Sequence, residues 1–166
     1  MNTEPEKRDL VITRVFDAPV EQVWQAWSDP EDVKQWWGPN GFTAPIVEID
    51  FREGGRGFLC MSSPDYGDNY SLWDFQKIVP LEQIEYIHNL ADVEGNKVDP
   101  VAMGMPPDFP QDQLQAISFK AISDNQTELT VTEYGWTVGQ MMEMSEMGMN
   151  QCLDKMATLL QAGDQS

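Results

Sequence analysis

The sequence contains little of what most catalytic and metal sites require. It has one histidine, His88, and two cysteines, Cys60 and Cys152, which are far apart and form no Cys-x-x-Cys pair. No cluster has the ligand spacing of a zinc site, and the carboxylates do not follow a calcium-loop pattern. The Gly-x-Ser-x-Gly elbow and the glycine-rich phosphate-binding patterns are also absent. The sequence therefore predicts no metal, no cofactor and no Ser-His-Asp or Cys-His triad.

Basic residues and long apolar stretches are scarce as well. Ten Lys and Arg residues stand against 28 Asp and Glu residues, and the formal net charge is -18. Such an acidic surface repels nucleic acid and anionic lipid, so neither is an expected partner. No stretch reaches the roughly 18 apolar residues of a membrane span, and the first residues lack the apolar core of a signal peptide. We therefore expect a cytoplasmic protein without membrane insertion, in which Cys60 and Cys152 are buried thiols rather than a disulfide.

Hydrophobic periodicity and turn residues predict one strand, two short helices, six further strands and one long helix. The two short helices begin after Pro19 and Asp29, and the long helix runs over residues 137–161. The proline-rich stretch 91–112 is expected to be an irregular excursion. Residues 1–8 and 162–166 are expected to be flexible. The predicted strands are residues 9–16, 42–51, 56–61, 70–79, 83–90, 115–122 and 127–136.

Two adjacent tryptophans, Trp36 and Trp37, end the second short helix before the turn Gly38-Pro39. We expect Trp36 to plug the core and Trp37 to lie near the rim of any cavity. The long helix is rich in methionine, which suits either ordinary core filling or a pliable wall for varied apolar ligands. Both interpretations remain open.

Four stretches of the sequence follow one another in the order of a known family. They are VFDAPVEQVWQAWSDPEDVKQWWGPNGF, EIDFREGGRG, IVPLEQIEYI and the closing TELTVTEYGW with GMNQCLDKMATLL. Together they resemble the START-like, or SRPBCC, superfamily over residues 9–161, and within it the bacterial homologues of the heat-shock-chaperone ATPase activator, the Aha-type branch. The resemblance implies a single α+β domain with a helix-grip fold. In that fold a curved antiparallel sheet wraps around a long C-terminal helix, and two short helices close one end.

In this superfamily the space between sheet and helix commonly contains a small apolar or aromatic molecule. The resemblance therefore implies such a ligand, which is lipid-like, polyketide-like or a stress metabolite. Trp73 replaces a glycine usual in relatives and would fill this space, whereas Met149 replaces a frequent tryptophan and would open it. In strand 56–61 Phe58 and Cys60 are apolar too, so both strand parities remain open there. The residues expected to face the ligand are Trp37, Leu59, Met61, Trp73, Phe75, Tyr86, His88, Ile117, Phe119, Glu133, Met142, Met149, Leu153 and Met156.

The same inward positions leave two roles for His88 and Glu133. If both face the cavity, they form an acid–base pair for a cofactor-independent cyclase or dehydratase. The interpretation that we favour is a polar pair that orients a ligand in a non-catalytic binding protein. The subfamily name implies a third role, as a chaperone ATPase-activating partner, although the chain has no room for the additional domain of the eukaryotic activators. Both a monomer and a homodimer are compatible with the sequence.

Overall fold

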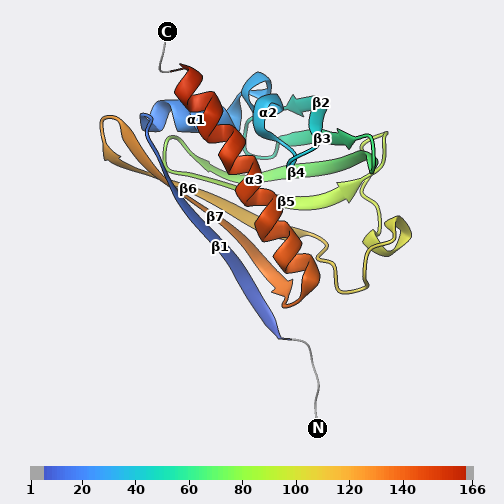
Figure 1. The fold of residues 1–166 in the computed structure, drawn as a ribbon. Coiled ribbons are helices and arrows are strands. Elements are labelled where there is room, and N and C mark those ends of the chain that lie inside the picture. Colours follow the sequence, from blue (N-terminus) through green and yellow to red (C-terminus); the bar gives the residue numbers. More distant parts are fainter. Residues whose placement is uncertain (1–5, 164–166) are drawn as a thin grey trace.

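The computed structural model describes residues 6–163, with side chains as far as residue 161, and contains an open seven-stranded sheet crossed by one long helix (Figure 1). The strand order is β1-β7-β6-β5-β4-β3-β2, and every neighbouring pair is antiparallel. This arrangement confirms the predicted α+β helix-grip fold. The elements are β1 (Lys7–Phe16), α1 (Val20–Ser28), α2 (Pro30–Trp36), β2 (Thr43–Ile49), β3 (Arg56–Ser63), β4 (Gly67–Val79), β5 (Gln83–Ala91), the 3-10 helix η1 (Pro100–Met103), β6 (Gln113–Ser123), β7 (Gln126–Thr137) and α3 (Gln140–Gly163).

The starts of β1 and α3 differ from the sequence-based prediction because the outer strands pair further than expected. Strand β1 begins at Lys7, which pairs with Thr137 at the end of β7. The N–H of Val138 then donates to the carbonyl of Glu6 over 2.8 Å, so α3 begins only at Gln140 rather than at residue 137. Residues 7–8 belong to β1 and residues 162–163 to α3, although they fall in the two tails expected from the sequence. The remaining residues of the two predicted tails, 1–5 and 164–166, lie outside the described part of the chain.

Helices α1 and α2 begin where the sequence predicts, for identifiable reasons. Pro19 precedes α1, and Pro30 occupies the first position of α2, where its missing N–H has no consequence. The carboxylate of Asp29 accepts a hydrogen bond from the N–H of Glu31 at 2.9 Å and so caps α2. No described helix combines the length and apolar character that crossing a lipid bilayer requires.

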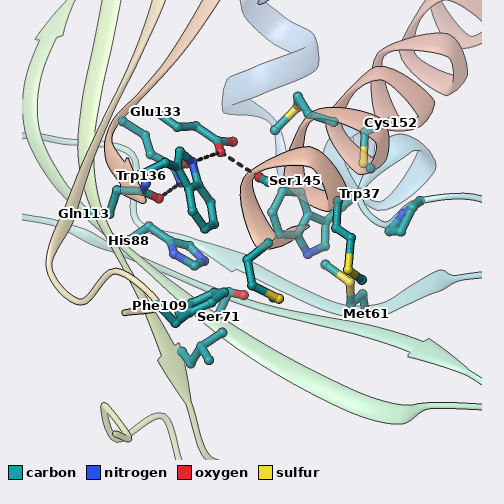
Figure 2. A pocket seen from close by; sticks show the side chains of 17 residues that line it. Trp37, Met61, Ser71, His88, Phe109, Gln113, Glu133, Trp136, Ser145 and Cys152 are labelled. Atoms are coloured by element: carbon teal, nitrogen blue, oxygen red, sulfur yellow. Dashed lines mark hydrogen bonds between the residues drawn. The ribbon is translucent and has the colours of Figure 1, made fainter. Parts of the chain in front are cut away.

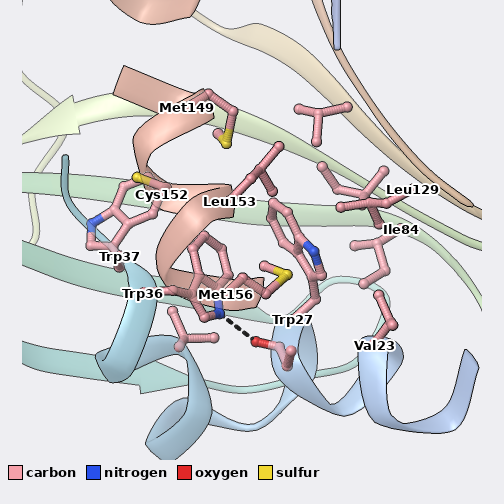
Figure 3. Close-up of a cluster of buried hydrophobic side chains, with 14 of the residues drawn as sticks. Val23, Trp27, Trp36, Trp37, Ile84, Leu129, Met149, Cys152, Leu153 and Met156 are labelled. Atoms are coloured by element: carbon pink, nitrogen blue, oxygen red, sulfur yellow. Dashed lines mark hydrogen bonds between the residues drawn. The ribbon is translucent and has the colours of Figure 1, made fainter. Parts of the chain in front are cut away.

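The two short helices supply indole rings to the core at one end of the sheet (Figure 3). Trp27 and Trp36 are 1% and 0% exposed, and their ring centroids are 4.5 Å apart. The Nε1 of Trp36 donates to the carbonyl of Ala26 over 2.7 Å. Trp36 is therefore the core plug that the sequence predicts.

Trp73 on β4 fills space between the sheet and these rings. Its ring centroid lies 6.0 Å from that of Trp27, 5.3 Å from that of Trp37 and 4.6 Å from that of Tyr86. Leu153 and Met156 of α3, both fully buried, belong to the same hydrophobic cluster. This end of the space between sheet and helix is consequently a packed core.

Candidate functional site

A cavity of about 260 Å³ lies between the N-terminal half of α3 and strands β3 to β7, beside the packed core (Figure 2). The turn after α2 and the excursion before β6 complete its wall through Trp37, Pro39 and Phe109. Most lining side chains are apolar, and a few polar groups from β4 to β7 and α3 lie among them. The cavity therefore occupies the place in the fold where the resemblance predicts a ligand.

Five of the predicted ligand-binding residues line this cavity. Trp37 contributes from the end of α2, Met61 from β3, His88 from β5, Glu133 from β7 and Met149 from α3. Leu59 is fully buried and Met61 lines the cavity, so β3 has the parity that places both residues on its inner face. The structure thus brings His88 and Glu133 to one cavity and places Trp37 in its wall.

The other nine predicted residues lie outside the cavity wall. Eight of them point inward, as the sequence predicts, but lie in the packed core. The rings of Trp27, Trp36 and Trp73 fill that part of the space between the sheet and α3. Met142 is half-buried on α3 and does not line the cavity. The eight that are buried in the packed core are Leu59, Trp73, Phe75, Tyr86, Ile117, Phe119, Leu153 and Met156.

Trp136 lines the cavity although the alternation of β7 predicts the opposite side for it. Strand β1 pairs Leu10 with Glu133 but Arg8 with Trp136, so β7 carries one extra residue between these pairs. Gly135 adopts a φ of 74° at this bulge, a conformation that glycine accommodates without strain. The bulge turns Trp136 inward, where it is 4% exposed. A glycine directly before a large aromatic residue at a strand end was the available sequence signal.

Two further lining residues, Gln113 and Gln115, lie at the start of β6. Strand β6 begins at Gln113, two residues before the predicted start, and Gln113 and Gln115 continue the inward face of Ile117 and Phe119. The Nε2 of Gln115 donates to Oε1 of Gln113 at 2.9 Å. The period of β6 alone would have revealed both glutamines. Met141 and Met144 belong to the methionine-rich long helix, for which the sequence left a pliable ligand wall open. The other lining residues outside the predicted set are Pro39, Ser71, Leu90, Phe109, Ser145, Gly148 and Cys152.

Glu133 is a carboxylate with well-defined partners inside the cavity wall (Figure 2). Its side chain is 3% exposed, and its Oε1 accepts hydrogen bonds from Nε1 of Trp136 at 2.9 Å and Oγ of Ser145 at 2.7 Å. Burial raises the pKa of Glu133 above its ordinary value, and the two hydrogen bonds oppose that rise. The carboxyl group is therefore oriented, and burial makes its ionisation less favourable than in water.

His88 lies in the same wall but is not bonded to Glu133. Burial lowers the pKa of His88 to about 4, so the imidazole is uncharged at neutral pH. Among the described residues, no hydrogen bond or ion pair joins it to Glu133. The two groups consequently act separately, His88 as a neutral imidazole and Glu133 as the ionisable carboxyl group.

The cysteines are free and buried, as the sequence predicts. Cys152 lines the cavity, and burial raises the pKa of its thiol to about 11. The thiol is therefore protonated at neutral pH and is a poor nucleophile. Across residues 6–163, no group of three or more His, Cys, Asp or Glu side chains is arranged to ligate a metal ion.

Comparison with known proteins places the chain in a family. The family described as Activator of Hsp90 ATPase homolog 1-like protein matches residues 17–161. A protein from Arthrobacter aurescens with a solution structure is 25% identical, with a TM-score of 0.76 over 96% of this chain and 92% of that one. The AHSA1 protein from Silicibacter pomeroyi shares the fold at 19% identity, with a TM-score of 0.73 over 94% of this chain and 99% of that one.

A third similar structure, the AHSA1-like protein from Aeromonas hydrophila, shares the fold at 15% identity and a TM-score of 0.72, with 96% of each chain covered. No curated protein matches the sequence. Since the family match spans most of the chain and agrees with the helix-grip fold, this protein belongs to the Activator of Hsp90 ATPase homolog 1-like family.

Proposed function

We propose that the protein binds a small apolar or aromatic molecule in the cavity between the sheet and the N-terminal half of α3. The observation that carries the proposal is the cavity itself, a mostly apolar space with a few polar side chains, next to a core that is otherwise filled. Sites of this composition are typical for small ligands, because apolar walls provide affinity and isolated polar groups provide orientation.

The cavity volume limits the size of the ligand. An apolar cavity of about 150 Å³ accommodates benzene. The space of about 260 Å³ here suits a molecule with two fused rings or a branched chain of similar volume. A long lipid chain would extend through the mouth of the cavity. A compact aromatic molecule is therefore the best-fitting ligand among those that the resemblance implies.

Four methionines in the wall support tolerance for different apolar shapes. They are Met61 on β3 and Met141, Met144 and Met149 on α3. Methionine has three rotatable bonds and a polarisable sulfur atom, so it adapts to ligands of varied outline. We infer that the site accepts a class of compounds rather than one compound. It selects them by the volume of the ligand and by contacts with the polar side chains of the cavity wall.

Calorimetric titration with neutral alcohols of increasing size, phenylethanol, naphthylethanol and pyrenylmethanol, tests the proposal. We expect naphthylethanol to bind best, because phenylethanol leaves space unfilled and pyrenylmethanol exceeds the cavity. Gly148→Leu adds bulk to the wall and should weaken naphthylethanol binding about tenfold or more. Met147→Leu, which changes an apolar residue on the exposed side of the same helix, should leave it unchanged. Equal binding by both variants, or no binding of any probe, would contradict the proposal.

A cofactor-independent cyclase or dehydratase is a second candidate function. It is favoured by the presence of a neutral imidazole, His88, and a carboxyl group with a raised pKa, Glu133, in one cavity. Incubation of bound compounds followed by mass spectrometry tests it, with His88→Gln and Glu133→Gln as variants. Turnover that both variants lose while they retain binding would favour the enzyme over the pure binding protein. A chaperone partner, suggested by the family name, stays a prediction that co-precipitation with the cognate chaperone checks.

A further inference from the structure

Glu133 has one carboxylate oxygen that no described residue engages. Trp136 and Ser145 both donate to Oε1, and neither donates to Oε2. Four other buried side-chain atoms also lack a partner, but they are fully enclosed, whereas Oε2 is not among them and keeps accessible surface. Glu133 is 3% exposed as a residue and lines the cavity. Oε2 is therefore an acceptor that a bound molecule can reach.

No positive charge in the described structure balances Glu133. The cavity wall contains neither lysine nor arginine, and none of the ion pairs among the described residues involves Glu133. Lys155, further along α3, donates instead to the carbonyls of Gly38, Pro39 and Phe42. His88 is uncharged at neutral pH because burial lowers its pKa to about 4. Buried carboxylates are ordinarily paired with a cation, and here the protein does not supply one.

The rest of the wall suits a cation. The aromatic rings of Trp37, Phe109 and Trp136 line the cavity, and the last two pack edge to face with centroids 5.6 Å apart. Aromatic faces attract ammonium groups within about 6 Å, and tryptophan does so most strongly. The formal net charge of -18 also raises the concentration of cations near the surface. An anionic ligand, such as a fatty acid, meets repulsion from both Glu133 and the surface.

Building on the proposed binding function, we propose that the preferred ligand is an organic cation, a protonated amine on a compact aromatic or apolar body, whose ammonium group donates to Oε2 of Glu133. The apolar body then lies against the methionines of the wall, and the aromatic rings surround the charged end. Ser145 and Trp136 fix the carboxylate through Oε1 and leave Oε2 for the ligand. The cavity thereby selects by charge as well as by volume.

Three probes with one ring system and different end groups test the proposal on the full-length protein. Naphthylethylamine, naphthylethanol and naphthylacetate carry a positive, a neutral and a negative group, and each affinity is measured by calorimetry at neutral pH. We expect the amine to bind about tenfold or more tightly than the alcohol, because a charge-assisted hydrogen bond is stronger than a neutral one. The acid should bind most weakly.

Two charge-removing variants locate the source of this preference. Glu133→Gln keeps the shape of the side chain but removes its charge, so the amine and the alcohol should bind within about twofold of each other. Glu146→Gln removes the same charge from an exposed position of α3 and should retain the preference for the amine. Circular dichroism of each variant verifies the fold. If Glu133→Gln does not fold, the relative affinities of the wild-type protein for the three probes still test the preference for a cation.

The outcomes separate this proposal from the binding function on which it rests. If the alcohol or the acid binds as tightly as the amine to the wild-type protein, charge selection is overturned while small-molecule binding stands. If Glu133→Gln keeps the full preference for the amine, Glu133 is not the recognition group and the proposal fails. If none of the three probes binds, the binding function fails together with it.

Discussion

The two halves of α3 cover the same sheet but meet different surroundings. In the C-terminal half, Leu153 and Met156 are fully buried against the indole rings that α1 and α2 supply. In the N-terminal half, Met144 is 49% exposed, and Ser145 and Gly148 line the cavity. One end of the helix therefore stabilises the fold through complete packing, whereas the other leaves space for a ligand.

The strands show the same division along their inward faces. On β6 these positions change from Gln113 and Gln115 at the cavity to Ile117 and Phe119 in the core. On β7 the change runs from Glu133 to Val131 and Leu129. Polar inward positions and the small helix residues thus occur together, and the cavity lies where they meet.

The largest effect is expected from opening the packed end. Trp36→Ala removes a fully buried ring and its hydrogen bond to Ala26, and should lower the free energy of unfolding by about 3–5 kcal/mol. Met144→Ala at the cavity end removes a half-exposed side chain and should cost less than about 1 kcal/mol. Urea denaturation measures both. Similar losses for the two variants would contradict the division.

The second prediction uses the single histidine as a probe of the cavity end. Because burial lowers the pKa of His88 from 6.5 to about 4, its imidazole resonance should titrate near pH 4 in the folded protein. Between about pH 6.5 and pH 4 the unfolded chain binds a proton at His88 that the folded protein does not. The free energy of unfolding should therefore be highest above about pH 6.5 and should fall as the pH decreases toward about 4. NMR follows the titration, and urea denaturation across this pH window follows the stability.

His88→Gln is the control for this pH dependence. The variant should lose less stability than the wild type between about pH 6.5 and pH 4, since its side chain does not gain a proton. A titration midpoint of His88 close to pH 6.5 would show that the imidazole is as well hydrated as in the unfolded chain. The cavity wall around His88 would then be open to water, which contradicts its burial.

The smallest effect concerns Gly148, a glycine inside a helix. A Cβ atom at this position would meet the ring of Pro39 at 3.8 Å, an ordinary contact, and would otherwise face the cavity. Gly148→Ala should therefore raise the free energy of unfolding by about 0.5–1 kcal/mol, because alanine restricts the unfolded chain and favours the helix. Urea denaturation checks this increase. A loss of stability would mean that the wall at this point is already fully packed.

Much of the fold followed from local patterns, and the cavity followed only in part. Prolines and Asp29 mark the starts of α1 and α2, and alternation identified most inward positions of the strands. Alternation shows which side of the sheet a side chain faces but not how far it lies from the cavity. Leu59 and Phe75 were therefore expected at the ligand, although the rings around Trp73 enclose them in the core. How much space large side chains leave depends on their packing in three dimensions.

Trp136, which the sequence did not indicate, lines the cavity for a separate reason. Its inward position depends on one extra residue at Gly135, which pairing with β1 reveals and the period of β7 conceals. The late start of α3 has the same origin, because the hydrogen bond between Val138 and Glu6 belongs to contacts between distant parts of the chain. Local periodicity contains no information about either.

The hydrogen bond from Trp136 to Glu133 makes the cavity observable without any label. An indole N–H that donates to a carboxylate gives an NMR signal whose position depends on the charge and the contacts of that carboxylate. Any molecule that approaches Glu133 will therefore shift the Trp136 signal, while the indole of Trp36, bonded to a backbone carbonyl in the packed core, provides an internal reference. The protein contains its own pair of sensors, Trp136 in the cavity wall and Trp36 in the packed core, and a single spectrum compares them.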